Sequence, residues 1–180
     1  PYIMLAAAGD WPAPLDFCHA AGLELPNEEE GYVLRTANGR AAISANNERG
    51  LFYGATTLVQ LISTDENGPY LRGAEVEDWP SLDFRGVHCL TGRNAGGEVA
   101  HAVRDLMARH KMNKLVWQCE FLKWDSHPEI HHAYYGMEKS DAQQVLDMAD
   151  RVLMEVIPLI PSLGHAEWVF TNNQNQDIAE

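Results

Sequence analysis

The chain has 180 residues, 46% of them hydrophobic, and carries 26 acidic against 13 basic side chains, for a formal net charge of -13. This length suits one ordinary domain or two small ones. The charge argues against nucleic-acid and anionic-membrane partners, which need a basic surface, and is compatible with a neutral substrate such as a sugar. No apolar run approaches the roughly 20 residues needed to cross a bilayer. Cys18, Cys89 and Cys119 are an odd number set far apart, which predicts free buried thiols rather than a disulfide framework or a zinc cluster.

Residues 1–76 predict a small α/β domain. An apolar run at 2–8 favours a strand, and a stretch rich in proline and glycine favours a loop up to residue 28. Two β-rich runs, 32–36 and 40–45, flank Asn38-Gly39, the dipeptide typical of tight hairpin turns. Asn46 or Asn47 can then cap a helix whose apolar positions recur at helical spacing up to Ile62. Residues 65–69 have turn composition, and 70–75 favour one more strand.

Residues 78–81, Asp-Trp-Pro-Ser, indicate a domain boundary, so we expect a second domain at 77–180. Strand patterns at 84–90, 114–119 and 155–163 alternate with a helical stripe at 99–110 and with a helix that opens at Ser140. Gln143 stands three residues after Ser140, the spacing of a capping box. This alternation predicts β/α units and a parallel sheet, open or closed into a barrel.

Three β/α units are less than half of a (β/α)8 TIM-type barrel. The fold class expected is therefore a small α+β domain followed by an incomplete barrel, which either continues in further chain or self-associates through its open edge. The chain begins at Pro1 without a signal-peptide pattern and stops in an Asn/Gln-rich tract. Both ends look cut, so localisation stays open, with the extracellular space and the periplasm among the options.

Polar side chains near the strands are the candidates for chemistry, because ligands of parallel α/β sheets sit at the carboxyl ends of strands. Arg85, inside an apolar strand, either holds sugar hydroxyls or an anionic group at a wet site, or pairs with a buried carboxylate. Trp117 and Glu120 close the second strand. An aromatic ring can stack on the apolar face of a sugar and a carboxylate can accept hydroxyl hydrogen bonds, although a tryptophan by itself is more often a core residue.

His165 and Glu167 follow the third strand directly after Gly164, a residue that allows the backbone to turn sharply. A histidine beside a carboxylate can orient a group or transfer a proton. The alternative is a histidine with a purely structural role at the end of a strand.

Two other patterns are not expected to be sites. His127 and His131 are four residues apart, but Pro128 argues against a helix that would put both imidazoles on one face, so a solvated loop is preferred to a metal site. Residues 92–97 are rich in glycine but lack the Lys and Ser or Thr of a phosphate loop. We therefore expect no metal and no cofactor.

Several stretches, in order, resemble one family. Residues 43–46 and 50–61 resemble the end of the small α/β domain that precedes the barrel in family 20 glycoside hydrolases, the β-N-acetylhexosaminidases. Residues 78–87 are similar to the start of that family's first barrel strand, 110–115 to the approach to its second, and 157–165 to its third strand and Gly-His turn. The likeness runs from about residue 31 onward, and the order and spacing make it more specific than any single motif.

The resemblance implies hydrolysis of terminal N-acetylhexosamine, with the substrate's own acetamido oxygen attacking the anomeric carbon. It implies that Arg85 grips sugar hydroxyls, that His165 is the site histidine and that Glu120 lies near the acidic position after the second strand. Together with Trp117 and Glu167, these residues form the expected substrate-binding set.

The family's catalytic Asp-Glu pair follows the fourth barrel strand, and residues 77–180 contain no such dipeptide. We therefore expect no catalytic residue in this chain, which by itself should be inactive. Two alternatives stay open at this point. One is another (β/α)-barrel glycosidase, such as an α-glucuronidase or an O-GlcNAcase-like enzyme, and the other is a non-catalytic carbohydrate-binding module.

Overall fold

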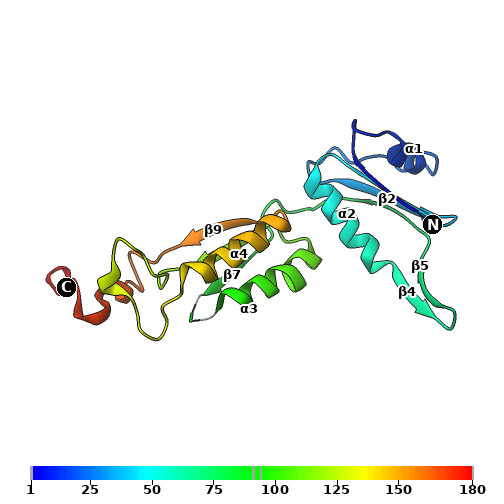
Figure 1. The fold of residues 1–180 in the computed structure, drawn as a ribbon. Helices are drawn as coiled ribbons and strands as arrows, with labels where there is room; N and C mark the ends of the chain where they lie inside the picture. Colours follow the sequence, from blue (N-terminus) through cyan, green and yellow to red (C-terminus); the bar gives the residue numbers. More distant parts are fainter. Residues whose placement is uncertain (1, 91, 94, 180) are drawn as a thin grey trace. The chain divides into compact units, whose positions relative to one another are not determined.

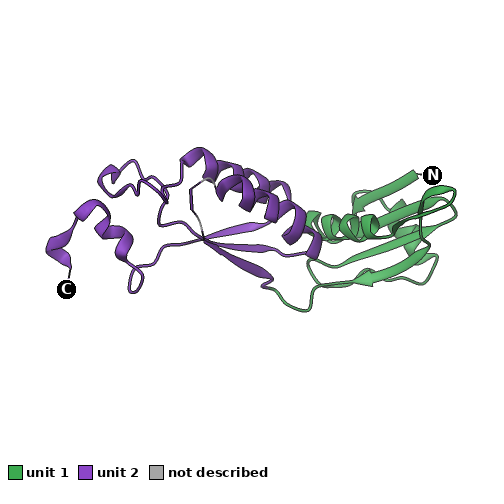
Figure 2. Ribbon diagram, turned by 90° about the horizontal axis from the view of Figure 1, so that it is seen from below, with its two compact units in different colours: residues 1–83 green, residues 84–180 purple. Residues whose placement is uncertain are grey.

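The chain, shown in Figure 1 as a computed structural model, is described at residues 2–90, 92–93 and 95–179. It divides into two compact units, Pro1–Asp83 and Phe84–Glu180, coloured separately in Figure 2. Strand β6 (Ala74–Asp78) runs across the expected 76/77 boundary and pairs with the sheet of the first unit as far as Asp78. The division therefore falls seven residues later than the sequence indicated.

The first unit is built on a four-stranded sheet with the order β1-β3-β2-β6. Strands β2 (Tyr32–Ala37) and β3 (Arg40–Ala45) form the predicted antiparallel hairpin. Asn38 and Gly39 turn the chain with φ values of 52° and 73°, the left-handed region that this dipeptide tolerates. Strand β1 (Tyr2–Ala7) pairs in parallel with β3.

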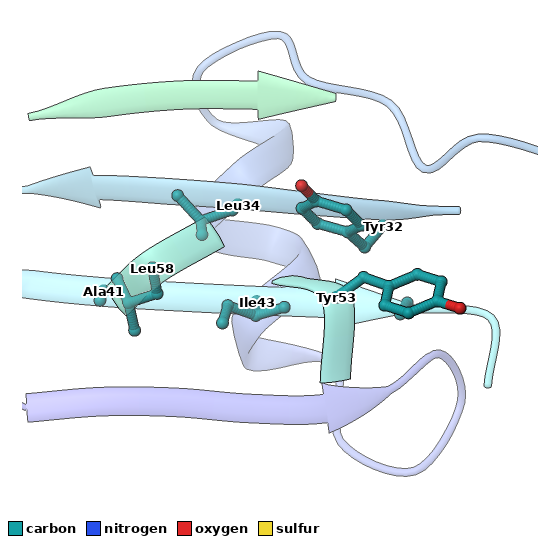
Figure 3. Packing of buried hydrophobic residues seen from close by; sticks show 7 residues of the cluster. Tyr32, Leu34, Ala41, Ile43, Tyr53 and Leu58 are labelled. Carbon is teal, nitrogen blue, oxygen red and sulfur yellow. The ribbon is translucent and has the colours of Figure 1, made fainter. Parts of the chain in front are cut away.

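Helix α2 (Glu48–Gln60) covers one face of this sheet. Of the two candidate caps, Asn47 is the N-cap, and its Oδ1 accepts a hydrogen bond from the Gly50 backbone N–H at 2.9 Å. A Cβ atom at Gly54 would lie 2.4 Å from Ile43 Cγ2, so the glycine lets the helix approach the strand. Figure 3 shows the resulting core, which contains Tyr32, Leu34, Ala41, Ile43, Tyr53 and Leu58.

The opposite face is covered by helix α1 (Ala13–His19), where the sequence predicted a loop. That prediction was wrong because prolines are tolerated in the first turn of a helix, where the backbone N–H has no partner to lose. Cys18 is fully buried there with Met4, Val33 and Ala42. Burial raises the pKa of the Cys18 thiol to about 11. All three cysteines are free, as predicted, but Cys89 is only half-buried, so the expectation that all three are buried is wrong.

A separate hairpin, β4 (Ile62–Asp65) and β5 (Gly68–Leu71), follows α2. The predicted turn is confirmed, with Asn67 donating its backbone N–H to Asp65 Oδ1 at 2.8 Å. The single strand expected at 70–75 is wrong, because β5 ends at Leu71 and β6 begins at Ala74 in the other sheet.

The second unit contains the predicted parallel sheet, with the order β7-β8-β9. Its strands are β7 (Gly86–Leu90), β8 (Lys114–Gln118) and β9 (Glu155–Leu159). Helix α3 (Ala95–Ala102) continues through a π-helical turn, η1 (Val103–Met107), and a 3-10 turn, η2 (Ala108–His110), into β8, and α4 (Lys139–Arg151) leads into β9. Three further 3-10 segments lie in the loops: η3 (Pro128–Ile130), η4 (Glu167–Asn173) and η5 (Gln176–Ile178).

Helices α3 and α4 lie on the same side of this sheet (Figures 1 and 2). Along β8, Leu115 and Trp117 are buried while Lys114, Val116 and Gln118 are only half-buried, so alternate side chains face the helices and the uncovered side. The two helices touch closely at Gly96, where a Cβ atom would lie 2.5 Å from the Asp141 carbonyl oxygen. The uncovered face of the sheet is where a site can be built.

The start of α4 differs from the expectation. The helix begins at Lys139 with Glu138 as N-cap and no side-chain cap, so the Ser140–Gln143 capping box is wrong. Gln143 instead donates from Nε2 to Asp147 Oδ1 at 2.7 Å, one turn further along the helix. Among the helices of the described residues, none is long and apolar enough to cross a membrane.

Candidate functional site at the carboxyl ends of the parallel strands

Three polar side chains form a hydrogen-bonded row at the carboxyl end of the second unit's sheet. The Gln118 amide Nε2 donates to Glu120 Oε1 at 2.8 Å, and Gln118 Oε1 lies 3.0 Å from His88 Nε2. Because the amide N–H is used on the carboxylate, the amide oxygen is the acceptor and His88 Nε2 is the donor. The register of β7 and β8, in which His88 pairs with Val116 and Leu90 with Gln118, brings these side chains to one face.

Glu120 has one oxygen left for a ligand. Its Oε1 is held by Gln118, whereas its Oε2 is buried and has no hydrogen-bond partner among the described residues. A buried carboxylate oxygen without a partner is costly, and a ligand hydroxyl would remove that cost. Glu120 is therefore the best-defined acceptor at this edge of the sheet.

The placement of Arg85 corrects the expectation made from the sequence. Strand β7 begins at Gly86, two residues later than predicted, so Arg85 directly precedes the amino end of the strand and does not lie at its carboxyl end. Its Nε donates to the Lys111 carbonyl at 2.8 Å, and its backbone N–H donates to Asn113 Oδ1 at 3.0 Å. Arg85 thus stabilises the turn before β8, and it lies too far from the carboxyl ends of the strands to bind a sugar there.

Arg93 is the arginine that follows the carboxyl end of β7, and its side chain is exposed. Sequence reasoning missed it because the surrounding glycines were considered only as an anion-binding loop. Its position three residues after the end of the predicted strand at 84–90 was the signal that could have found it. Asn94, which belongs to the same glycine-rich stretch, lies outside the described residues.

Trp117 does not join this row. It is 4% exposed and lies on the same side of β8 as buried Leu115, beneath the helices. The indole Nε1 is buried with no hydrogen-bond partner among the described residues. The ring therefore fills the helix-covered core, and the expected stacking on a sugar face is not supported by its placement.

His165 and Glu167 lie in the loop that follows β9, and both are exposed. The sharp turn there is made by His165 itself, with φ of 54°, and not by Gly164 as expected. Glu167 opens the segment η4 and lines a second group of residues described below. Of the five expected residues, the structure thus brings Glu120 into the row and assigns the other four to different surroundings.

The histidine-rich loop makes local hydrogen bonds of its own. His127 Nδ1 lies 3.1 Å from Glu129 Oε1, and His131 Nε2 lies 2.9 Å from the Trp124 carbonyl. Hydrogen bonds from its own backbone N–H and from His127 hold the pKa of Glu129 below its ordinary value. Within the described ranges, no group of three or more His, Cys, Asp or Glu side chains is placed to hold a metal ion.

A pocket of about 400 Å³ lies between the loop after β8 and segment η4. We call it the aromatic pocket, because five of its side chains carry rings. It is lined by Phe121, His132, Ala133, Tyr135, Glu167, Trp168, Phe170, Thr171 and Asn172. Among the expected site residues, only Glu167 belongs to it.

The fold defines a protein of the α/β class. A small sheet with helices on both faces is followed by parallel β/α units, and polar side chains lie at the carboxyl ends of the parallel strands. Residues 6–79 match the family model described as glycosyl hydrolase family 20, domain 2. This match, together with the relatives described next, supports a fragment of glycoside hydrolase family 20.

The relatives of the chain have names that agree with this family. A β-hexosaminidase of Porphyromonas gingivalis is 25% identical over 79% of this chain and 22% of its own length. The family 20 β-N-acetylhexosaminidase of Streptomyces coelicolor aligns with a TM-score of 0.69 at 26% identity, over 82% of this chain and 35% of that structure. A β-N-acetylglucosaminidase of Vibrio harveyi, solved with N-acetylglucosamine, aligns at 0.66 and 20% identity over 79% and 27% of the two chains. The chain thus spans about a quarter to a third of these proteins.

Proposed function

We propose that the protein containing these residues is a glycoside hydrolase that removes terminal N-acetylhexosamine, with the substrate's acetamido oxygen as the nucleophile. The observation that carries the proposal is the family 20 match at residues 6–79, followed by parallel strands whose carboxyl ends present Glu120. The names of the relatives agree with this reaction, and a family 20 structure has been solved with N-acetylglucosamine. The net charge of -13 suits a neutral sugar.

In this proposal, residues 1–76 correspond to the small α/β domain before the barrel, and residues 77–180 to the first three β/α units of a (β/α)8 barrel. The uncovered face of the β7-β8-β9 sheet is then the interior of the barrel, and the carboxyl ends of its strands form part of the active-site floor. The Asp-Glu pair that polarises the acetamido group and protonates the leaving group is proposed to lie outside residues 1–180.

Within this chain, Glu120 Oε2 is proposed to accept a hydroxyl hydrogen bond from the sugar. Gln118 holds the other carboxylate oxygen, so the acceptor is oriented before substrate arrives. Arg93, which follows the carboxyl end of β7, is proposed in place of Arg85 as the donor to sugar hydroxyls. His165, on the loop after β9, remains a proposed contact on the same edge. These residues bind and orient the sugar, and none of them is proposed as the acid or the nucleophile.

Replacing Glu120 by glutamine tests this assignment in the natural protein that contains the chain. We expect kcat/KM for p-nitrophenyl N-acetyl-β-D-glucosaminide to fall about 10- to 100-fold, the cost of losing one hydrogen bond to a charged acceptor. Glu66→Gln, in the exposed turn between β4 and β5, is the matched control and should leave kcat/KM within about twofold. Equal values for the two variants would remove Glu120 from the site.

A further inference from the structure

The aromatic pocket of the second unit is not explained by the row at the strand ends. Its wall is a set of rings in mutual contact. The ring centroids of His132 and Tyr135 are 4.7 Å apart, and those of Phe121 and Tyr135 are 5.6 Å apart, with interplanar angles of 37° and 40°. Tyr135 is nevertheless 48% exposed. A preformed ring surface that stays open to solvent is a surface available for a ligand with an apolar face.

His132 contributes a hydrogen-bond donor of fixed position. Its Nδ1 accepts from the backbone N–H groups of Tyr134 and Tyr135 at 3.1 and 3.0 Å. Because Nδ1 is the acceptor of both bonds, the neutral ring carries its hydrogen on Nε2. The pocket therefore has one donor fixed in place by the backbone.

Segment η4 closes the other side of the pocket and is tied to the loop after β8. Asn172 Nδ2 donates to the carbonyl oxygens of Glu129 and His131 at 2.9 and 3.0 Å. Trp168 Nε1 donates to the Pro161 carbonyl at 2.9 Å. The Asn172 bonds hold the two walls at a defined separation without a ligand, and the Trp168 bond fixes η4 to its own loop, which lowers the conformational entropy lost on binding.

The chemistry of the lining selects the kind of ligand. Exposed aromatic rings suit the C–H face of a pyranose, the His132 Nε2–H suits a hydroxyl oxygen, and the Glu167 carboxylate suits a hydroxyl hydrogen. A volume of about 400 Å³ lies within the range of sites that hold one small ligand. The Glu167 charge and the acidic chain disfavour anionic sugars.

We propose that the aromatic pocket is a second carbohydrate-binding site, which holds one neutral pyranose ring stacked on Phe121 and Tyr135. If the bound pyranose belongs to the same glycan as the hydrolysed sugar, that part of the inference rests on the proposed function. The binding itself does not, because all the residues that form the pocket lie within the second unit and no bond is broken there.

Binding to the 180-residue chain tests the inference, with N,N′-diacetylchitobiose as the probe and tryptophan fluorescence and amide NMR shifts as readouts. We expect saturable binding, with shifts at residues 121–135 and 167–172. Tyr135→Ala should weaken it at least about tenfold, since the ring is part of the stacking surface. Tyr70→Ala is the matched control, because Tyr70 is a similarly exposed tyrosine, at 45%, in the first unit. Far-UV circular dichroism confirms that each variant is folded.

Equal affinity in Tyr135→Ala and Tyr70→Ala would overturn the inference, and so would the lack of saturable binding up to about 50 mM probe, a concentration well above the Kd of weak specific sites. Tighter binding of glucuronic acid than of N-acetylglucosamine would overturn the neutral-ligand assignment. If the natural protein hydrolyses the N-acetyl substrate but the chain does not bind the probe, this inference fails and the proposed function stands. If the chain binds the probe but the natural protein does not hydrolyse the substrate, the second site stands and the proposed function fails.

Discussion

Gly96→Ala is expected to lower the free energy of unfolding of the second unit by about 2 to 3 kcal/mol, the upper part of the range for overpacking a close contact. A Cβ atom at Gly96 would lie 2.5 Å from the Asp141 carbonyl oxygen and 2.7 Å from Asp141 Cα. Both atoms belong to the backbone of α4, so the whole helix must shift to relieve the clash. Chemical denaturation followed by circular dichroism measures the change.

Gly97→Ala provides the matched control in the same helix. Its nearest neighbour would be Gln144 Oε1 at 3.9 Å, an ordinary contact. Alanine there should keep or raise stability by up to about 1 kcal/mol, because it has the higher helix propensity. Equal effects of the two substitutions would mean that α3 and α4 do not pack at Gly96.

Leu34→Ala is expected to cost the first unit about 2 to 5 kcal/mol, the range for removing a fully buried leucine side chain. Leu34 is 0% exposed in the core between β2, β3 and α2 (Figure 3). Leu82→Ala makes the same chemical change at a side chain that is 67% exposed and should cost no more than about 0.5 kcal/mol. Urea unfolding of both variants measures the difference. A cost for Leu34→Ala no larger than that for Leu82→Ala would contradict the described core.

Helices, strands and turns that are specified by neighbouring residues were predictable from the sequence. Asn38-Gly39 supplies two positions that tolerate positive φ, which sets the hairpin and its register. Asn47 supplies the side-chain acceptor that starts α2, and Gly54 marks where the helix approaches β3. The strand and helix rhythm of residues 84–159 likewise predicted the parallel sheet, because local periodicity decides element type there.

Elements that depend on tertiary contact were not predictable. Helix α1 has two prolines in or next to its first turn and owes its place to burial of Cys18 against the sheet, which no local pattern announces. Arg85 was assigned to the carboxyl end of its strand because an arginine in an apolar run suggests a wet site, although the predicted strand at 84–90 and the observed strand at 86–90 both leave it near the amino end.

The candidate site was predictable only in part. Glu120 was identified because a carboxylate after a strand is a recognisable pattern. The row from His88 through Gln118 was not, because it depends on the register between β7 and β8. Trp117 was assigned to the sugar by residue type, whereas the alternation of side chains along β8 buries it under the helices.

The most direct test of the family 20 assignment compares two substrates of the natural protein that contains this chain. The proposal predicts hydrolysis of p-nitrophenyl N-acetyl-β-D-glucosaminide at least about 100-fold faster than of p-nitrophenyl β-D-glucoside, because only the former carries the intramolecular nucleophile. The isolated 180-residue chain should hydrolyse neither. Equal rates for the two glycosides, or turnover of the N-acetyl substrate by residues 1–180 alone, would contradict the proposed function.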